Sequence, residues 1–195
     1  MSPDLLPAET VRFDSGTPAL DLFPRQRWAK AVNRVLREAP DTVLGYDFPQ
    51  GRPELREALA RHLKKTRGIA ADPDRILITS GTKQALTLAG QCLLNEKSRV
   101  LLEDPSNSNV RKIFAGCTAC LIPVPVDEDG LQTALPPAGA DLVFVTPSHQ
   151  FPMGALLPIQ RRLELIRFTR RTGCWESRRG CMSWRISGTA CFLPT

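Results

Sequence analysis

The hydrophobic pattern of residues 75–94 changes character at one turn of small residues. Ile76–Thr79 is a run of β-branched and aliphatic residues, which predicts a short buried strand. After Ser80-Gly81-Thr82, apolar residues recur at helical spacing, at Ala85, Leu86, Leu88, Ala89, Cys92 and Leu93. The stretch therefore predicts a strand that passes through a glycine turn into a helix.

Two amphipathic helices are predicted before this stretch. The first runs from Gln26 to Ala39 and ends at Pro40, with Trp28, Ala31, Val32, Val35 and Leu36 on one face. The second begins with Pro53 in its first turn, continues to Thr66 and ends at Gly68.

Strands and helices alternate in the second half of the chain. The apolar runs predict strands over Arg99–Glu103, Cys120–Val124 and Leu142–Val145. Helices are predicted over Val110–Ala115 and Pro158–Arg171, and a short helix or bend over Leu131–Leu135. Because the strands are continuously apolar rather than alternating, we expect a mostly parallel α/β sheet that is covered on both faces.

Ligands of parallel α/β sheets bind beyond the carboxyl ends of the strands, where the loops at Ser80, Asp104 and Ser148 would lie together. The helix that starts after Gly81 would leave unpaired backbone N–H groups and partial positive charge at its N-terminus, and this favours a phosphate. The Ser80 and Thr82 hydroxyls would be further donors. A plain structural turn is the alternative, since many α/β crossovers contain one.

Composition and charge argue against a membrane protein and against direct nucleic-acid binding. The hydrophobic content of 42% and the charged content of 24% are ordinary for a globular protein, and 195 residues suit one domain. No apolar run is long enough for a membrane helix and no signal peptide is evident, so we expect a cytoplasmic protein without membrane contact. The net charge of +6 arises entirely from residues 161–195, which leaves no basic stripe on the body, and direct nucleic-acid binding is not expected.

The spacing of the cysteines indicates neither a metal site nor a redox motif. Cys117 and Cys120 form one C-x-x-C pair that leads into an apolar run. A zinc site would need a second ligand pair, and a redox motif would open a helix. We therefore interpret the pair as small buried thiols and predict no metal site.

Four segments, in this order, resemble the class I/II aminotransferases of the pyridoxal-phosphate fold-type I group. They are LGYDFPQGRPELREALARHL (44–63), ILITSGTKQAL (76–86), LLEDPSN (101–107) and VFVTPSHQFPMG (143–154). SGTKQAL, LEDP and TPSHQFPMG are most similar to the aminotransferase-like domain of MocR-type regulators of the GntR superfamily. The resemblance implies a partial three-layer α/β/α large domain, incomplete in its sheet, with pyridoxal 5'-phosphate as cofactor.

The resemblance also assigns residues to the cofactor. Gly81, Thr82 and Lys83 would bind the cofactor phosphate. Tyr46 matches a tyrosine that reaches toward the phosphate of the neighbouring subunit in family homodimers, and a buried loop anchor is its alternative. The expected small-molecule ligand is an amino acid or amine.

Two further positions lie around the cofactor ring. Asn107 stands where the family usually has a tyrosine that stacks on the ring, so we expect weaker cofactor binding. The loop at His149-Gln150 would border the ring, and a plain loop residue is the alternative for His149. Phe151 replaces the asparagine that precedes the Pro-Thr-Gly of the usual enzymes.

The family's covalent anchor is not found among these residues. Both the lysine that holds the cofactor and the aspartate at its ring nitrogen follow the TPSHQFPMG segment in the family, whereas here the last lysine is Lys112 and the last aspartate is Asp141. We therefore assign no catalytic residue and expect a catalytically incompetent fragment. The alternative is an effector or dimerisation remnant of a MocR-type regulator without its winged-helix domain.

The chain is predicted to have three parts. Residues 1–11 are an expected disordered lead-in, 12–172 the partial aminotransferase-like domain and 173–195 an unstructured tail. The tail follows no helical or alternating period, and we interpret it as a frameshift or deletion product, with a divergent natural tail as the alternative. A sheet cut short would expose an edge, so we expect marginal stability and aggregation.

Overall fold

The computed structural model describes residues 18–46, 48–118, 120–134 and 140–171, together with 185–186 and 190–191. The chain divides into two units, Met1–Arg52 and Pro53–Thr195, which are described separately. The predicted lead-in and most of the predicted tail lie outside the described residues.

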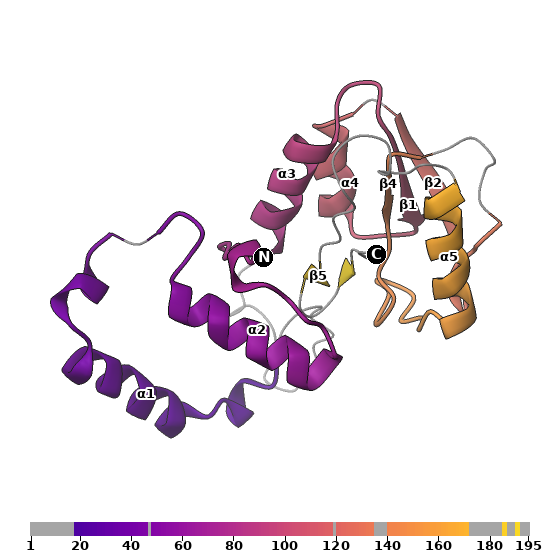
Figure 1. Cartoon of the computed structure of the whole chain (residues 1–195). Helices are drawn as coiled ribbons and strands as arrows, with labels where there is room; N and C mark the ends of the chain where they lie inside the picture. The colour runs from indigo at the N-terminus through magenta and orange to yellow at the C-terminus, as the bar shows by residue number, and fades with distance from the viewer. Residues whose placement is uncertain are drawn as a thin grey trace, which may run out of the picture. The chain divides into compact units, whose positions relative to one another are not determined.

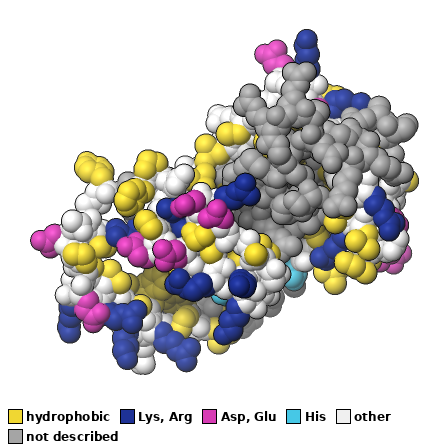
Figure 2. Space-filling model, viewed as in Figure 1, with side chains coloured by type: hydrophobic (Ala, Val, Ile, Leu, Met, Phe, Trp, Pro, Cys, Tyr) yellow, Lys and Arg dark blue, Asp and Glu magenta, His cyan; other side chains and the backbone are white. Residues whose placement is uncertain are grey.

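The first unit is built around helix α1 (Arg25–Glu38), which confirms the first predicted helix and ends before Pro40. Two 3-10 helices flank it, η2 (Leu20–Leu22) and η3 (Asp41–Leu44). Helix α1 buries none of its residues, and its apolar face, including Trp28 and Leu36, is exposed. In Figure 2, Lys and Arg side chains line the lower left edge, where Figure 1 labels α1, and apolar side chains lie above them.

A four-stranded sheet forms the centre of the second unit, in the order β3-β2-β1-β4. Strand β1 (Arg99–Asp104) pairs in parallel with β2 (Cys120–Asp127) and with β4 (Leu142–Phe144). Strand β3 (Gly130–Leu131) pairs antiparallel with β2. The predicted α/β class with a mostly parallel sheet is confirmed.

Helices cover both faces of the sheet, as predicted (Figure 1). On one face, Leu86 of α3 (Thr82–Leu93) and Phe114 of α4 (Ser108–Ala115) pack with side chains of β1 and β4. On the other, Leu165 and Phe168 of α5 (Ile159–Arg171) pack with β1 and β2. Neighbouring residues of β1 point to opposite faces, so its continuous apolar run serves both cores.

Two predicted elements are wrong, the second of them in part. Ile76–Thr79 is not a strand, because a strand needs a hydrogen-bonded neighbour and this segment pairs with no strand in the described part of the chain. The short helix or bend predicted over Leu131–Leu135 is wrong at Leu131, which forms strand β3 with Gly130. Thr133 does lie in a bend, and Leu135 lies outside the described residues. Gly130 has φ 89°, which turns the chain back so that the fully buried Leu131 pairs with Val126.

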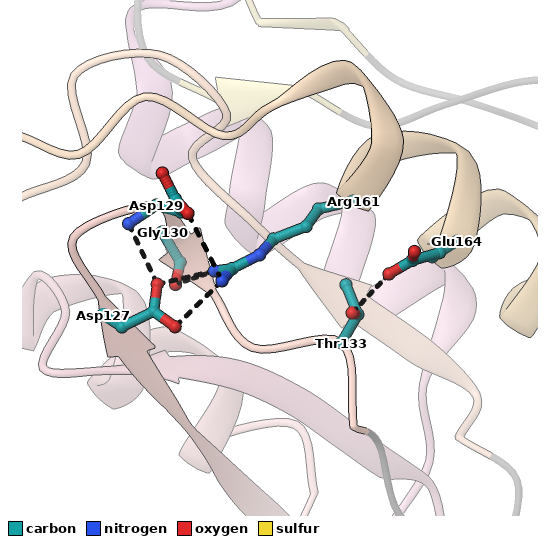
Figure 3. Close-up of polar contacts among 6 residues, drawn as sticks. All are labelled: Asp127, Asp129, Gly130, Thr133, Arg161 and Glu164. Carbon is teal, nitrogen blue, oxygen red and sulfur yellow. Dashed lines mark hydrogen bonds and ion pairs between the residues drawn. The ribbon is translucent and has the colours of Figure 1, made fainter.

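An ion-pair cluster attaches helix α5 to the β2–β3 turn (Figure 3). Arg161 donates to both carboxylate oxygens of Asp127, at 2.6 and 3.0 Å, and to the carbonyl of Gly130 at 3.2 Å. These hydrogen bonds lower the pKa of Asp127 and raise that of Arg161. On the next turn of the helix, Glu164 accepts a hydrogen bond from Thr133.

Helix α2 (Pro53–Arg67) confirms the second predicted helix and ends before Gly68, which has φ 66°. Its buried Arg56 donates to the carbonyl of Pro73, at 2.8 Å, and to Asp74, at 3.1 Å, in the 3-10 helix η4 (Pro73–Arg75). This contact holds the segment that leads into α3.

Short strands β5 (Arg185–Ile186) and β6 (Ala190–Cys191) form an antiparallel pair near the C-terminus. Among the described residues, no helix is both long and apolar enough to span a membrane. Cys92, Cys117 and Cys120 are free thiols. The interpretation of the Cys117 and Cys120 pair as small buried thiols is wrong in part, because both residues are only half-buried. Cys92 is exposed.

Candidate functional site

The N-terminus of helix α3 lies toward the carboxyl ends of the parallel strands. A short connection joins the C-terminus of α3 to the start of β1, so helix and strand run in opposite directions (Figure 1). Leu86 fixes the helix against Val100 and Leu102 of β1. The start of α3 and the loops after β1 and β4 therefore belong to one edge of the sheet, the edge at which α/β proteins bind ligands.

Gly81 is the N-cap of α3 and has backbone angles that favour glycine. Its φ is 155° and ψ is 177°, and no side chain caps the helix. A Cβ atom at this position would meet nothing within 4 Å, so the space in front of the helix start is open on this side. The first amides of α3 have no partner within the helix, and a compact anion could accept hydrogen bonds from them.

The hydroxyl of Ser80 is already engaged at this turn. The Ser80 amide and hydroxyl both donate to Oε1 of Gln84, at 2.6 and 3.0 Å. The expectation that Ser80 serves as a further ligand donor is therefore not met in this arrangement. Thr82 and Lys83, by contrast, are exposed in the first turn of α3. The Lys83 ammonium adds positive charge to the helix end.

Asn107 caps the helix that follows β1. Its side chain accepts a hydrogen bond from the Asn109 amide at 2.9 Å, and its carbonyl accepts one from Val110 at 3.0 Å. This is a usual N-cap arrangement, to which asparagine is well suited. The Asn107 side chain therefore has a structural function here, whatever else it contacts.

A buried carboxylate joins the two loops beside Asn107. Glu103, at the end of β1, is 2% exposed and accepts hydrogen bonds from the amide of Thr146, at 3.0 Å, and from its hydroxyl. Nε2 of Gln150 donates to the same carboxylate at 3.4 Å and to the carbonyl of Pro105 at 2.8 Å. Burial raises the pKa of Glu103 above its ordinary value, and the hydrogen bonds partly oppose this rise.

The loop after β4 is held at both ends, with His149 between the anchors. His149 is exposed and has φ 58°, a left-handed conformation that is uncommon outside glycine. Gln150, its neighbour, is 2% exposed, and its Oε1 accepts from the Met153 amide at 3.1 Å. Arg162 of α5 donates to the carbonyls of Leu157 and Pro147, at 2.8 and 3.1 Å.

Ser106 carries a polar atom without a partner. Its Oγ is buried and has no hydrogen-bond partner within the described ranges. It lies between the Pro105 carbonyl, which Gln150 holds, and Asn107, which caps α4. This hydroxyl is therefore a spare donor in the loop after β1.

Tyr46 belongs to the first unit and is fully exposed, at 108% of its reference area. The alternative interpretation of Tyr46 as a buried loop anchor is therefore wrong. Two predictions stand for His149, a plain loop residue and a place beside the cofactor ring. Its exposure is compatible with both.

The residues that sequence reasoning misses are the buried ones. It does not predict Glu103 and Thr146 as site residues, and it places Gln150 beside the cofactor ring only as part of the loop with His149. Glu103 and Thr146 share one signal, a charged or polar residue at or just after the end of an apolar strand, where a buried side chain must find partners. Among the described residues, no group of three or more His, Cys, Asp or Glu side chains could hold a metal ion.

Comparisons with known proteins point to one family. The family model described as aminotransferase class I and II matches residues 8–175. The probable rhizopine catabolism regulatory protein MocR of Rhizobium meliloti is 31% identical over 86% of this chain and 34% of its own length. The HTH-type transcriptional regulator TauR of Rhodobacter capsulatus is 37% identical over 75% of this chain and 30% of its own.

Enzymes are similarly close. The 2-aminoadipate transaminase of Thermus thermophilus is 34% identical over 84% of this chain and 41% of its own length. The crystal structure of LysN, the α-aminoadipate aminotransferase of that species, superposes with a TM-score of 0.72 at 32% identity, and covers 83% of this chain and 41% of its own. That structure contains N-(5'-phosphopyridoxyl)-L-leucine. The chain thus spans about a third to two fifths of the length of these relatives.

Proposed function

Because the chain belongs to the class I and II aminotransferase family, we propose that it contributes the phosphate-binding part of a pyridoxal-phosphate site. The site lies at the carboxyl edge of the parallel sheet, and its anchor is the N-terminus of helix α3. When bound, pyridoxal phosphate supplies an electron sink for the bonds at the α-carbon of an amino acid. The residues described below would bind and orient it.

The single observation that carries this proposal is the uncapped start of α3. Gly81 leaves open space before the helix, no side chain occupies the cap, and the first amides lack partners within the helix. The helix dipole and the exposed Lys83 favour a dianionic phosphate over a neutral group. The residues present therefore fit the phosphate group of the cofactor.

The other predicted residues would have smaller roles. We propose that His149 borders the bound ring, because it is exposed at the apex of the loop after β4. Asn107 does not offer an aromatic face, and its side chain already caps α4, so stacking on the ring is lost. The expected consequence is weaker binding than in relatives with an aromatic residue there.

Homodimerisation is part of the proposal. The fully exposed Tyr46 is available to a second copy of the chain, as the resemblance implies. Light scattering of the 195-residue chain should give a dimer mass. A monomer mass at micromolar protein concentration would contradict this part.

We further propose that these 195 residues bind the cofactor without turning over amino acids. Every lysine of the sequence lies at or before Lys112, whereas the family resemblance expects the covalent anchor after residues 143–154. Holding the cofactor by a lysine amine is the step on which amino-group transfer depends.

A second candidate function is that of an effector domain. Two relatives that match most of this chain, MocR and TauR, are named as regulators rather than enzymes. In this case the site would bind the cofactor with an amino acid or amine and transmit occupancy to an attached domain. Ligand-dependent stabilisation without amino-group transfer would favour this function.

The test uses pyridoxal phosphate and pyridoxal, which lacks the phosphate. We expect the 195-residue chain to bind pyridoxal phosphate more tightly, and inorganic phosphate to compete. Gly81→Ala should weaken binding, because alanine is strained at this φ. Gly68→Ala is the matched control, since Gly68 also has positive φ and open space around it but lies after α2.

Two results would contradict the proposal. Equal affinity for pyridoxal phosphate and pyridoxal would show that the N-terminus of α3 does not bind the phosphate. A stoichiometric lysine adduct after borohydride reduction, or amino-group transfer by the 195-residue chain, would overturn the non-covalent part.

A further inference from the structure

The buried carboxylate of Glu103 accepts hydrogen bonds from two residues of the loop after β4, Thr146 and Gln150. Thr146 donates from its amide and its hydroxyl, and Gln150 donates from its side-chain amide. A carboxylate accepts only, so all three donors are satisfied by the ionised group without rearrangement. The residues that it holds begin and end the segment that contains His149.

Gln150 extends this network to the loop after β1. Its Nε2 donates to the carbonyl of Pro105, and its Oε1 accepts from the Met153 amide. The side chain is almost completely buried, so each of these groups would be costly to leave unpaired. Glu103 and Gln150 therefore hold the loops after β1 and β4 together.

A second anchor holds the loop at Pro147, next to Thr146. Arg162 of α5 donates to the carbonyls of Pro147 and Leu157. Arg162 contacts one residue of segment 146–150, Pro147, whereas Glu103 contacts Thr146 and Gln150 on either side of His149. Glu103 therefore contacts the chain on both sides of the exposed His149.

We propose that Glu103 is a positioning residue for ligand binding, which holds segment 146–150 against the loop after β1 so that His149 is presented in one conformation. The inference rests on the proposed function for its ligand, pyridoxal phosphate. The conformational part can be observed without any ligand. Glu103 itself would not touch the cofactor.

The primary test is an NMR measurement on Glu103→Gln in the 195-residue chain. The chain has two histidines, and His62 on α2 is an internal control for His149. The substituted glutamine places an NH2 group at one of the two carboxylate oxygen positions, so this donor faces either the Thr146 amide or the Gln150 side-chain amide. We expect the imidazole signals of His149 to shift or broaden, while those of His62 stay unchanged. Glu96→Gln, on the exposed turn after α3, should change neither signal.

Binding gives the second readout. If the variant keeps the binding-competent loop conformation in about one molecule in ten, its apparent affinity for pyridoxal phosphate falls about tenfold. The phosphate preference measured against pyridoxal should persist, because α3 is untouched. A purely structural effect would move both histidines and the melting temperature together.

Thr146 provides a milder perturbation if Glu103→Gln does not fold. Thr146→Val removes one donor to the carboxylate, and Thr146→Ser keeps it. We expect altered His149 signals and weaker binding in the first variant, and wild-type behaviour in the second. Unchanged His149 signals in Thr146→Val and Glu103→Gln would overturn the inference.

The two proposals fail differently. A wild-type chain that does not bind pyridoxal phosphate contradicts the proposed function, while the His149 signals still decide the role of Glu103. A wild-type chain that binds, with a Glu103→Gln variant that binds equally well, contradicts the positioning role alone.

Discussion

Gly90 of α3 lies against Cys117, which follows helix α4, and its substitution should be destabilising for a reason that helix propensity alone does not predict. A Cβ atom at Gly90 would lie 2.6 Å from Sγ of Cys117, well inside van der Waals contact. Its other neighbours, Cβ of Cys117 at 3.6 Å and Cδ1 of Phe114 at 3.8 Å, are at ordinary distances. The sulfur atom is therefore the one obstacle.

The magnitude follows from two opposing terms. Alanine is about 1 kcal/mol better than glycine in a helix interior, whereas overpacking of a core costs about 1–3 kcal/mol. Gly90→Ala should therefore lower the free energy of unfolding by about 1 kcal/mol. With Cys117→Ala as background, the obstacle is gone and the same substitution should raise stability by about 1 kcal/mol.

The assay is a double-mutant cycle by urea denaturation, followed by circular dichroism. We expect a coupling energy of about 2 kcal/mol between the two sites, which is larger than the roughly 0.5 kcal/mol of independent sites. Gln91→Gly, at the exposed neighbouring position, calibrates the propensity term. Additive effects of Gly90→Ala and Cys117→Ala would refute the close approach of Gly90 and Cys117.

Three further predictions concern buried and paired polar groups. The lowered pKa of Asp127 contributes stability that is fully present above the ordinary aspartate pKa of 3.8 and is lost as pH falls through the lowered value. Arg161→Gln should remove this loss. Thermal melts measured over a range of pH should therefore show a weaker acid dependence of the melting temperature in Arg161→Gln but not in the control Arg67→Gln. Because the pKa of Glu103 is raised, its contribution to stability is present below pH 4.5, the ordinary glutamate pKa, and is lost as pH rises through the raised value. Glu103→Gln should flatten this part of the plot of melting temperature against pH. An unchanged slope would contradict the burial argument. Ser106→Ala should be neutral or stabilising by up to about 1 kcal/mol in urea denaturation, since it removes a buried hydroxyl without a described partner, and a clear loss of stability would mean that the hydroxyl is bonded.

Local signals in the sequence predicted the helices well. Pro40 and Gly68 end α1 and α2 as expected, because both residues stop a helix through their own backbone properties. The apolar runs of β1, β2 and β4 predicted a parallel sheet, since strands buried on both faces need no alternation.

Pairing could not be predicted from local pattern. The run Ile76–Thr79 has strand composition, but a strand also requires a neighbour elsewhere in the chain, and Leu77 remains 38% exposed. Leu131 lies in a strand because Gly130 reverses the chain and brings Leu131 beside Val126 of β2. This long-range pairing overrides the weak local signal for a bend.

In the candidate site, too, local features are predictable from the sequence and long-range contacts are not. The helix start at Gly81 was predicted because small residues between an extended segment and a helix have a direct backbone consequence. The network around Glu103 was missed, since its partners lie 43 and 47 positions away in the sequence. Only the folded chain brings these loops together.

The most direct test of the central claim is a titration of the ¹⁵N-labelled chain with pyridoxal phosphate and with pyridoxal, followed through the backbone amides of residues 81–84. We expect saturable downfield shifts of these amides with pyridoxal phosphate, because the phosphate accepts their hydrogen bonds, and much smaller shifts with pyridoxal. Shifts that are equal for both compounds, or confined to residues far from the start of α3, would contradict a phosphate site at this helix end.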